Sequence, residues 1–337
     1  MIRFIIVRLL GAVVVLFVVS VVTFLIFQLG PLLSHTSPVY YYIGKVPFKP
    51  GSPALKALIH RFGFDLPLYA QYWHYLSGIL FGQTITDGVT TPIQCPAPCF
   101  GYSFRENDLV GDMLLGAAPV SISLCVGAAI LWLVGGVFVG TISGLRPRSW
   151  IDRVGMGGSL TAVSLPIFFT GPLLLLLFEY TLGWLPNVNY VPITQDPGQW
   201  FNSMILPWVS LAFLFAALYA RLTRSNMIET MGEDYVRTAR AKGLPWHTVV
   251  IKHGLRAALT PIVTIFGIDF GTLIGSTVIT ETVFNLRGLG YLSIHAIEQE
   301  DFPVILGVTI VAAVALVIAN LIVDVLYAVI DPRVTVH

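Results

Sequence analysis

Charged residues divide this chain into long apolar stretches. A bilayer core of about 30 Å requires about 20 apolar residues in a helix. Six stretches reach or approach that length: Leu9–Gly30, Met113–Leu145, Val154–Phe178, Met204–Ala220, Pro261–Thr280 and Phe302–Val323. We expect the last one to continue to about Ile330. The pattern therefore predicts an all-α membrane protein with six transmembrane helices.

Composition agrees with lipid as the solvent. Of 337 residues, 55% are hydrophobic and 11% are charged, whereas a soluble globular chain has about 25% charged residues. The formal net charge of +1 favours neither nucleic acid nor an acidic partner. The first apolar stretch exceeds the about 7–15 residues of a signal peptide core, and no small-x-small cleavage site follows it, so we expect a retained helix.

The distribution of positive charge predicts the orientation. Lysine and arginine accumulate on the cytoplasmic side of membrane proteins. The segment after the fourth stretch, residues 221–260, is the most basic part of the chain. Placing it in the cytoplasm also places both termini there. The predicted divisions are residues 1–30 (tail and first helix), 31–112 (a large outer region) and 113–333 (a five-helix core that contains the 221–260 loop).

The outer region is expected to carry helices and a cysteine pair. Apolar residues recur at helical spacing within Pro53–Leu80, which predicts surface helices on the membrane or on a partner. Cys95 and Cys99 bracket Pro-Ala-Pro. They are either free thiols or a local disulfide, and an oxidising outer space favours the disulfide. No further cysteine or histidine lies near them, so no metal site is expected.

Acids and glycines within the stretches suggest further roles. Asp269 lies well inside the fifth stretch, either on a translocation path or paired with a neighbouring helix. Three acids nearer the ends are expected at the membrane interface: Glu179, Glu281 and Asp324. Glycines recur every four residues in two stretches, which predicts tight helix packing: Gly136, Gly140 and Gly144, and Gly267, Gly271 and Gly275.

The sequence contains none of the common catalytic motifs. It has no GxxxxGK[ST] phosphate loop and no HExxH or GxSxG pattern. An intramembrane enzyme built on Asp269 would lack a recognisable base or nucleophile. A self-contained secondary transporter would be expected to show inverted repeats and more membrane acids. We therefore expect a non-catalytic chain that binds no cofactor or metal itself.

The basic loop predicts two short helices joined at a corner. The stretch 232–244 begins with acids and ends with bases, as the helix dipole favours. Gly243 suits the left-handed position after a helix, and Pro245 suits the first turn of a second helix, Pro245–Arg256. Such a corner would present four residues to a partner: Tyr235, Ala239, Leu244 and Trp246. The alternative is a loop that only anchors the topology by its charge.

This loop resembles the coupling loop of ABC importer permeases. Ala239 and Gly243 match the Ala-x-x-x-Gly element of that loop, and EDYVRTARAKGL is similar to the form in the dipeptide/oligopeptide branch. Further fragments resemble that branch in matching order: Phe64–Tyr72, Ser164–Phe169, Glu281–Phe284, Gly288–Gly290, Asp301–Pro303, Val323–Tyr327 and Asp331–Arg333. The chain departs from the pattern at Gln83–Phe104, which is a longer insertion, at Ala257 and at 285–287.

The resemblance implies a type I ABC importer permease in a bacterial plasma (inner) membrane. Its partners would be a homologous second permease, two ATPase subunits that hold ATP and Mg, and an extracytoplasmic substrate-binding protein. The cargo would be di- or oligopeptides or, alternatively, nickel, glutathione or another small solute. Implied coupling residues are Glu233, Tyr235, Ala239, Gly243, Leu244, Pro245 and Trp246, and path candidates are Ser164, Pro166, Phe168 and Asp269.

Overall fold

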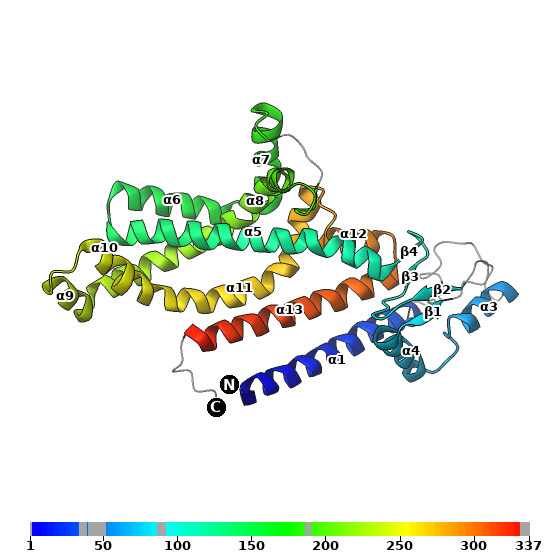
Figure 1. Ribbon diagram of the computed structural model, residues 1–337. Helices are drawn as coiled ribbons and strands as arrows, with labels where there is room; N and C mark the ends of the chain where they lie inside the picture. Colours follow the sequence, from blue (N-terminus) through cyan, green and yellow to red (C-terminus); the bar gives the residue numbers. More distant parts are fainter. Residues whose placement is uncertain (1, 34–38, 40–51, 86–91, 186–189, 331–337) are drawn as a thin grey trace. The chain divides into compact units, whose positions relative to one another are not determined.

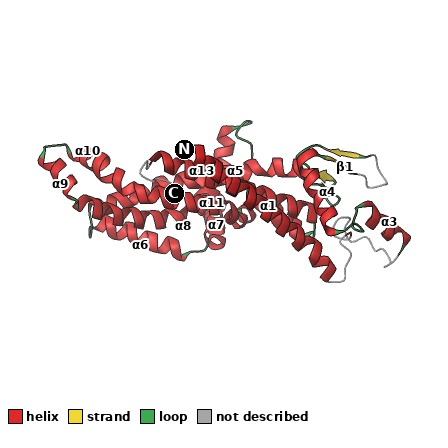
Figure 2. Ribbon diagram, turned by 90° about the horizontal axis from the view of Figure 1, so that it is seen from below, coloured by secondary structure: helices red, strands yellow, loops and turns green. Residues whose placement is uncertain are grey.

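The structure, a computed structural model, describes residues 2–33, 39, 52–85, 92–185 and 190–330. Helices make up most of this part of the chain (Figure 1), and the few strands are short (Figure 2). The chain groups into two compact units. Unit 1 comprises Met1–Pro119 and Arg287–Val317, and unit 2 comprises Val120–Leu286 and Ile318–His337. The resembling fragment Asp331–Arg333 lies outside the described residues.

The secondary structure begins with the elements of the first 109 residues. They are α1 (Ile2–Leu33), α3 (Pro53–Arg61), α4 (Leu68–Phe81), β1 (Gln83–Ile85), β2 (Ile93–Cys95), β3 (Tyr102–Ser103) and β4 (Asp108–Leu109). The remaining elements are α5 (Val110–Leu145), α6 (Trp150–Ser164), α7 (Ile167–Leu174), η1 (Leu175–Thr181), α8 (Pro197–Gly232), α9 (Asp234–Ala241), α10 (Trp246–Thr248), η2 (Val249–Leu255), α11 (Arg256–Val283), α12 (Leu289–Glu298) and α13 (Phe302–Ile330). The segments η1 and η2 are π-helical.

The six predicted spans correspond to five single helices and one bent helix pair. Within the described residues, five helices are long and apolar enough to cross a membrane, and a sixth span results if one bent pair is counted together. That pair is α6 and α7, which meet at 108°. The prediction of a continuous third helix over 154–178 is therefore wrong. Pro166 explains the break, because proline disfavours helical geometry at the preceding residue, and Leu165 is extended with ψ 117°.

Unit 1 places α4 against α1. Ser20 and Tyr72 share a hydrogen bond of 2.8 Å, and the ring of Phe24 contacts that of Tyr72 edge to face at 5.4 Å. The predicted helices within Pro53–Leu80 are confirmed as α3 and α4. One apolar face of α4 is directed to the chain's own first helix, and this intramolecular contact could not be seen in the periodicity.

Two small antiparallel sheets in unit 1 were not predicted. Strand β1 pairs with β2, and β3 pairs with β4. Each strand has only two or three residues, which is too short for an alternating pattern to be read from the sequence. Beside them, Cys95 and Cys99 form a disulfide, with their Cα atoms 5.5 Å apart.

In unit 2, α8 packs against α6 and α11. The glycine stripe on α5 lies against α8, as predicted. A Cβ atom at Gly136 would come within 2.6 Å of Tyr219 Cβ, and one at Gly144 within 2.7 Å of Met227 Cβ. A side chain at these positions would therefore push the helices apart. Of the second stripe, Gly267 and Gly271 are buried, while Gly275 is outside the described side chains.

One end acid does not lie at an interface. Glu281 on α11 is fully buried at 0% exposure and accepts a hydrogen bond of 2.6 Å from Ser121 on α5. The prediction of an interfacial position for Glu281 is wrong. Its hydroxyl partner lies 160 residues away in the sequence, so only the folded chain reveals how this acid is accommodated.

Candidate coupling and translocation sites

The corner between α9 and α10 has the predicted geometry at Gly243. Its φ angle is +78°, in the left-handed region that glycine adopts at little cost. The N–H of Gly243 donates to the carbonyl of Arg240 at 2.9 Å, and that of Lys242 donates to Thr238 at 3.0 Å. These bonds satisfy carbonyl groups at the end of α9. Asp234 in the first turn and Arg240 in the last turn match the helix dipole, also as predicted.

The second helix differs from the prediction of Pro245–Arg256. Pro245 precedes a single turn, α10, and the chain then continues through the π-helical η2 into α11. The side chain of Met231 on α8 lies where a Cβ atom at Gly254 would be, at 2.7 Å from its sulfur. Close packing on α8 therefore accompanies the wider helical turn. No feature of the sequence pattern signals a π-helix.

Three of the four predicted contact residues are exposed at this corner. Tyr235, Leu244 and Trp246 are 46%, 39% and 51% exposed. Ala239 is only 6% exposed because it packs with Val236 and Val249 in a small core. The prediction that Ala239 is available to a partner is wrong, because the turn into η2 covers that face of α9. The two other implied coupling residues, Glu233 and Pro245, are exposed and directly precede α9 and α10.

A cation–π contact connects the two sides of the corner. The guanidinium carbon of Arg240 lies 4.2 Å from the ring centre of Trp246. Such contacts contribute about 0.5–1 kcal/mol at exposed sites. The contact favours this orientation of Trp246, the largest apolar side chain at the corner. Sequence reasoning did not pair these residues, because they lie on different helices whose relative angle depends on Gly243.

An ion pair between α6 and α8 was also not predicted from the sequence. Arg224 donates to both carboxylate oxygens of Asp152, at 2.5 and 2.7 Å. Asp152 is 4% exposed and also accepts from the backbone N–H of Arg148 at 2.8 Å. A bidentate pair with a nearly buried carboxylate is among the stronger charge interactions. In the sequence, Arg224 is one of many bases, and only the packing of α6 on α8 selects it.

The path candidates divide between the helix break and α11. Ser164, Pro166 and Phe168 lie at the bend between α6 and α7 and are exposed in this chain, with Phe168 at 65%. Asp269 accepts a hydrogen bond of 2.9 Å from Tyr219 on α8. The structure therefore supplies the neighbouring-helix partner that was one of the two options for Asp269. A role of any of the four in translocation stays a prediction.

Within the described residues, no group of three or more histidine, cysteine or acidic side chains could hold a metal ion.

Comparison with known proteins identifies the chain's relatives. Residues 136–336 match the family described as binding-protein-dependent transport system inner membrane component, and residues 1–125 match the N-terminal family of the same system's membrane components. The chain belongs to the ABC importer permease family. Glutathione transport system permease proteins GsiC of Escherichia coli strain K12 and Shigella dysenteriae are each 34% identical to it over 99% of both chains.

A solved structure, an amino acid ABC transporter with histidines, is 14% identical and aligns with 64% of this chain and 94% of its own at a TM-score of 0.48. Membership in the family makes the chain a multi-pass membrane permease of an importer. The resemblance first seen in the coupling loop is therefore matched by family models over residues 1–125 and 136–336. The family is described as the inner membrane component of a binding-protein-dependent transport system, and these relatives are permease proteins of a glutathione transport system.

Proposed function

We propose that this permease imports peptide-like solutes as one half of a paired translocation pathway. The second half is a homologous permease. Two ATPase subunits bind ATP and Mg and dock on the α9–α10 corner, and an extracytoplasmic binding protein delivers the cargo. Both termini lie in the cytoplasm. This chain binds no cofactor and catalyses no reaction.

The observation that carries the coupling role is the α9–α10 corner. Tyr235, Leu244 and Trp246 expose apolar surface there, although the helices carry many charges. Figure 1 shows α9 and α10 at one end of unit 2, beyond the ends of α6 and α8. Exposed aromatic and apolar residues on a rigid projecting element are typical of docking hot spots. A corner that only anchored topology would not need them.

The corner is mechanically continuous with the membrane helices. Segment η2 leads from α10 directly into α11, and the amide of Asn226 on α8 donates to the carbonyl of Ala258 on α11 at 3.2 Å. A movement of docked ATPase subunits would therefore be transmitted to α8 and α11 together. Coupled rigid movement of packed helices is an established way to alternate between two openings.

The cargo is proposed from the family and its relatives. The peptide branch that the loop resembles and the glutathione permeases at 34% identity share an amide-linked, peptide-like solute. Glutathione is itself a tripeptide, so it falls within the same peptide-like class.

The test is co-purification followed by coupled hydrolysis. We expect the tagged chain, extracted in mild detergent, to recover a second permease and ATPase subunits. We expect Trp246→Ala to reduce that recovery at least tenfold, as for loss of a docking aromatic. Trp73→Ala provides a matched control, because Trp73 is 60% exposed on α4. Recovery of the chain alone, under conditions that preserve other importers, would contradict the proposal.

A further inference from the structure

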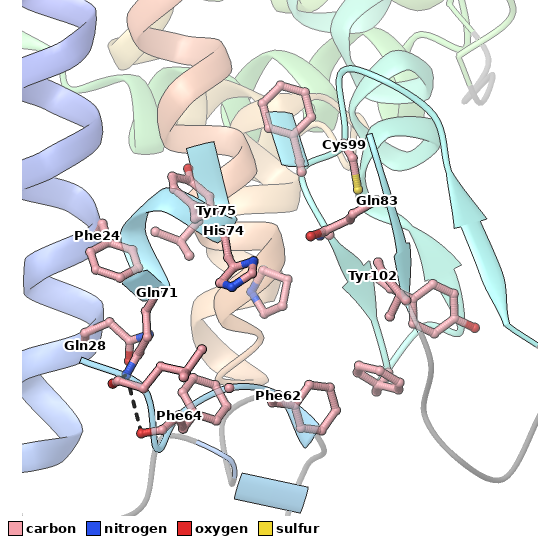
Figure 3. A pocket seen from close by; sticks show the side chains of 18 of the residues that line it. Phe24, Gln28, Phe62, Phe64, Gln71, His74, Tyr75, Gln83, Cys99 and Tyr102 are labelled. Atoms are coloured by element: carbon pink, nitrogen blue, oxygen red, sulfur yellow. Dashed lines mark hydrogen bonds between the residues drawn. The ribbon is translucent and has the colours of Figure 1, made fainter. Parts of the chain in front are cut away.

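Unit 1 contains a cavity of about 390 Å³ that none of the proposed coupling or path residues lines. Six segments form its walls: α1, the end of α3 with the 62–66 turn, α4, β1, residues 99–104 and the first turns of α13. Figure 3 shows His74 directed toward the middle of the cavity, between Gln71 on one side and Gln83 on the other. Its volume is within the about 300–1,000 Å³ range of small-molecule sites.

Much of the wall is aromatic. Phe62 contacts Phe104 edge to face at 5.6 Å, and Phe104 contacts Tyr102 in the same way at 5.0 Å. Phe24 lies on the opposite side, on α1 (Figure 3). Rings in such arrangements provide flat apolar surface that can enclose another ring or a branched side chain.

Carboxamide groups provide the polar part of the wall. Gln28 on α1 is only 7% exposed, and its Nε2 donates to Oε1 of Gln71 at 2.8 Å. Gln71 in turn donates to the carbonyl of Leu66 at 2.7 Å. Gln83 adds a third carboxamide to the lining. A carboxamide both donates and accepts hydrogen bonds, so the amide group of a ligand is complementary to it.

The cavity presents no unbalanced charge. None of its described lining residues is an aspartate, glutamate, lysine or arginine. His60 at the wall bonds Asp65 at 2.6 Å, and that carboxylate raises the pKa of the imidazole, so a protonated His60 is balanced by its partner. Burying a charged group without a counter-charge is strongly unfavourable. This lining therefore favours a neutral ligand over one that places a free ammonium or carboxylate against it.

The walls are held in place by the fold. The N–H of Cys99, which lines the cavity and is bound to Cys95, donates to the carbonyl of Gly78 on α4 at 3.3 Å. Gly82 ends α4 with φ +78°, and a Cβ atom there would come within 2.8 Å of the Cys95 carbonyl. The strand segment and α4 are thus closely joined, and the cavity is formed without a ligand.

We infer that this cavity binds an uncharged amide that carries an aromatic or branched apolar group. An internal residue of a peptide chain has this chemistry, since its backbone is neutral and its side chain can lie among the rings. The inference deepens the proposed function. It rests on that function only in taking the bound peptide to be cargo.

The test compares three small probes that share the phenylalanine side chain and differ in charge. They are N-acetyl-L-phenylalaninamide (neutral), N-acetyl-L-phenylalanine (anionic) and L-phenylalaninamide (cationic), titrated against the full chain in lipid nanodiscs by saturation-transfer NMR. We expect the neutral probe to bind at least tenfold more tightly than either charged one. Equal binding of all three, or no binding of the neutral probe, would overturn the inference.

Two variants locate the binding. Gln28→Leu removes a lining carboxamide and should weaken the neutral probe about tenfold. His74→Trp fills the cavity from its centre and should abolish binding. Gln94→Leu is the matched control, because Gln94 is exposed on β2 and does not line the cavity. Unchanged binding in both cavity variants would refute the site. If one variant misfolds, the other still decides.

Two sources present this chemistry, a free peptide and an extended loop of a partner protein. Repeating the titration on the co-purified complex separates them. Retained probe affinity assigns the cavity to a free peptide, and lost affinity assigns it to a partner's loop. Because the first titration uses the chain without ATP hydrolysis, failure of the cavity inference leaves the coupling proposal intact, and failed co-purification leaves the cavity result intact.

Discussion

Replacing Gly243 tests whether the backbone geometry of the α9–α10 corner transmits movement. The residue has φ +78°, and a Cβ atom built on it would meet nothing within 4 Å. The added Cβ atom would therefore cause no clash within this chain. A defect of Gly243→Val that Gly243→Asn does not share comes from the backbone conformation, because asparagine also has a larger side chain but tolerates a positive φ.

The magnitude follows from that conformation. An L-residue in the left-handed region costs about 1–2 kcal/mol, with β-branched residues disfavoured most and asparagine least. A difference of this size changes the ratio of the native corner to alternative conformations by a factor of about 5–30. We therefore expect Gly243→Val to lose most coupling, Gly243→Ala to lose less, and Gly243→Asn to remain close to the parent.

The assay measures solute uptake and solute-stimulated ATP hydrolysis in proteoliposomes that contain the complete transporter. We expect uptake and stimulation to fall in the order glycine, asparagine, alanine, valine, while unstimulated hydrolysis by the ATPase subunits stays constant. Gly157→Val is the control, because Gly157 lies on α6 with open space around it and no positive φ. Full activity of Gly243→Val, or an equal defect in the asparagine and valine variants, would refute the backbone argument.

Three further substitutions test the packing and the charges. Gly136→Val should destabilise the chain by about 1–3 kcal/mol through overpacking on α8. Gly135→Val should not, because a Cβ atom there meets nothing within 4 Å. Thermal unfolding in detergent measures both variants. Asp152→Ala should cost about 3 kcal/mol in the same assay by leaving Arg224 without its carboxylate, and a change below 0.5 kcal/mol would contradict it. Burial raises the pKa of Asp301 above its ordinary value of 3.8. The contribution of Asp301 to stability is therefore greatest below pH 3.8 and is lost as the pH rises through the folded-state pKa. Asp301→Asn should flatten the pH dependence of the melting temperature, and an unchanged profile would contradict this.

The hydrophobic pattern alone determined the membrane class and the apolar stretches that form the candidate spans. Long apolar stretches have few alternatives to a transmembrane helix, because every backbone polar group in lipid must be bonded within its own segment. The sequence also located the corner at Gly243, since glycine at the end of a polar helix is a local signal that needs no tertiary contact. Spacing was likewise sufficient for the packing stripe at Gly136 and Gly144, because it depends on helix periodicity.

Tertiary structure decided the features that depend on partners far apart in the sequence. The pairing of Asp152 with Arg224 and the burial of Glu281 beside Ser121 join helices that are many residues apart. The cavity of unit 1 requires α1, α4 and the start of α13 together. Local propensity cannot select such contacts, since each residue has several chemically equivalent candidates. The choice is made when helices pack, and the space between helices is then fixed by side chains that no single segment contains.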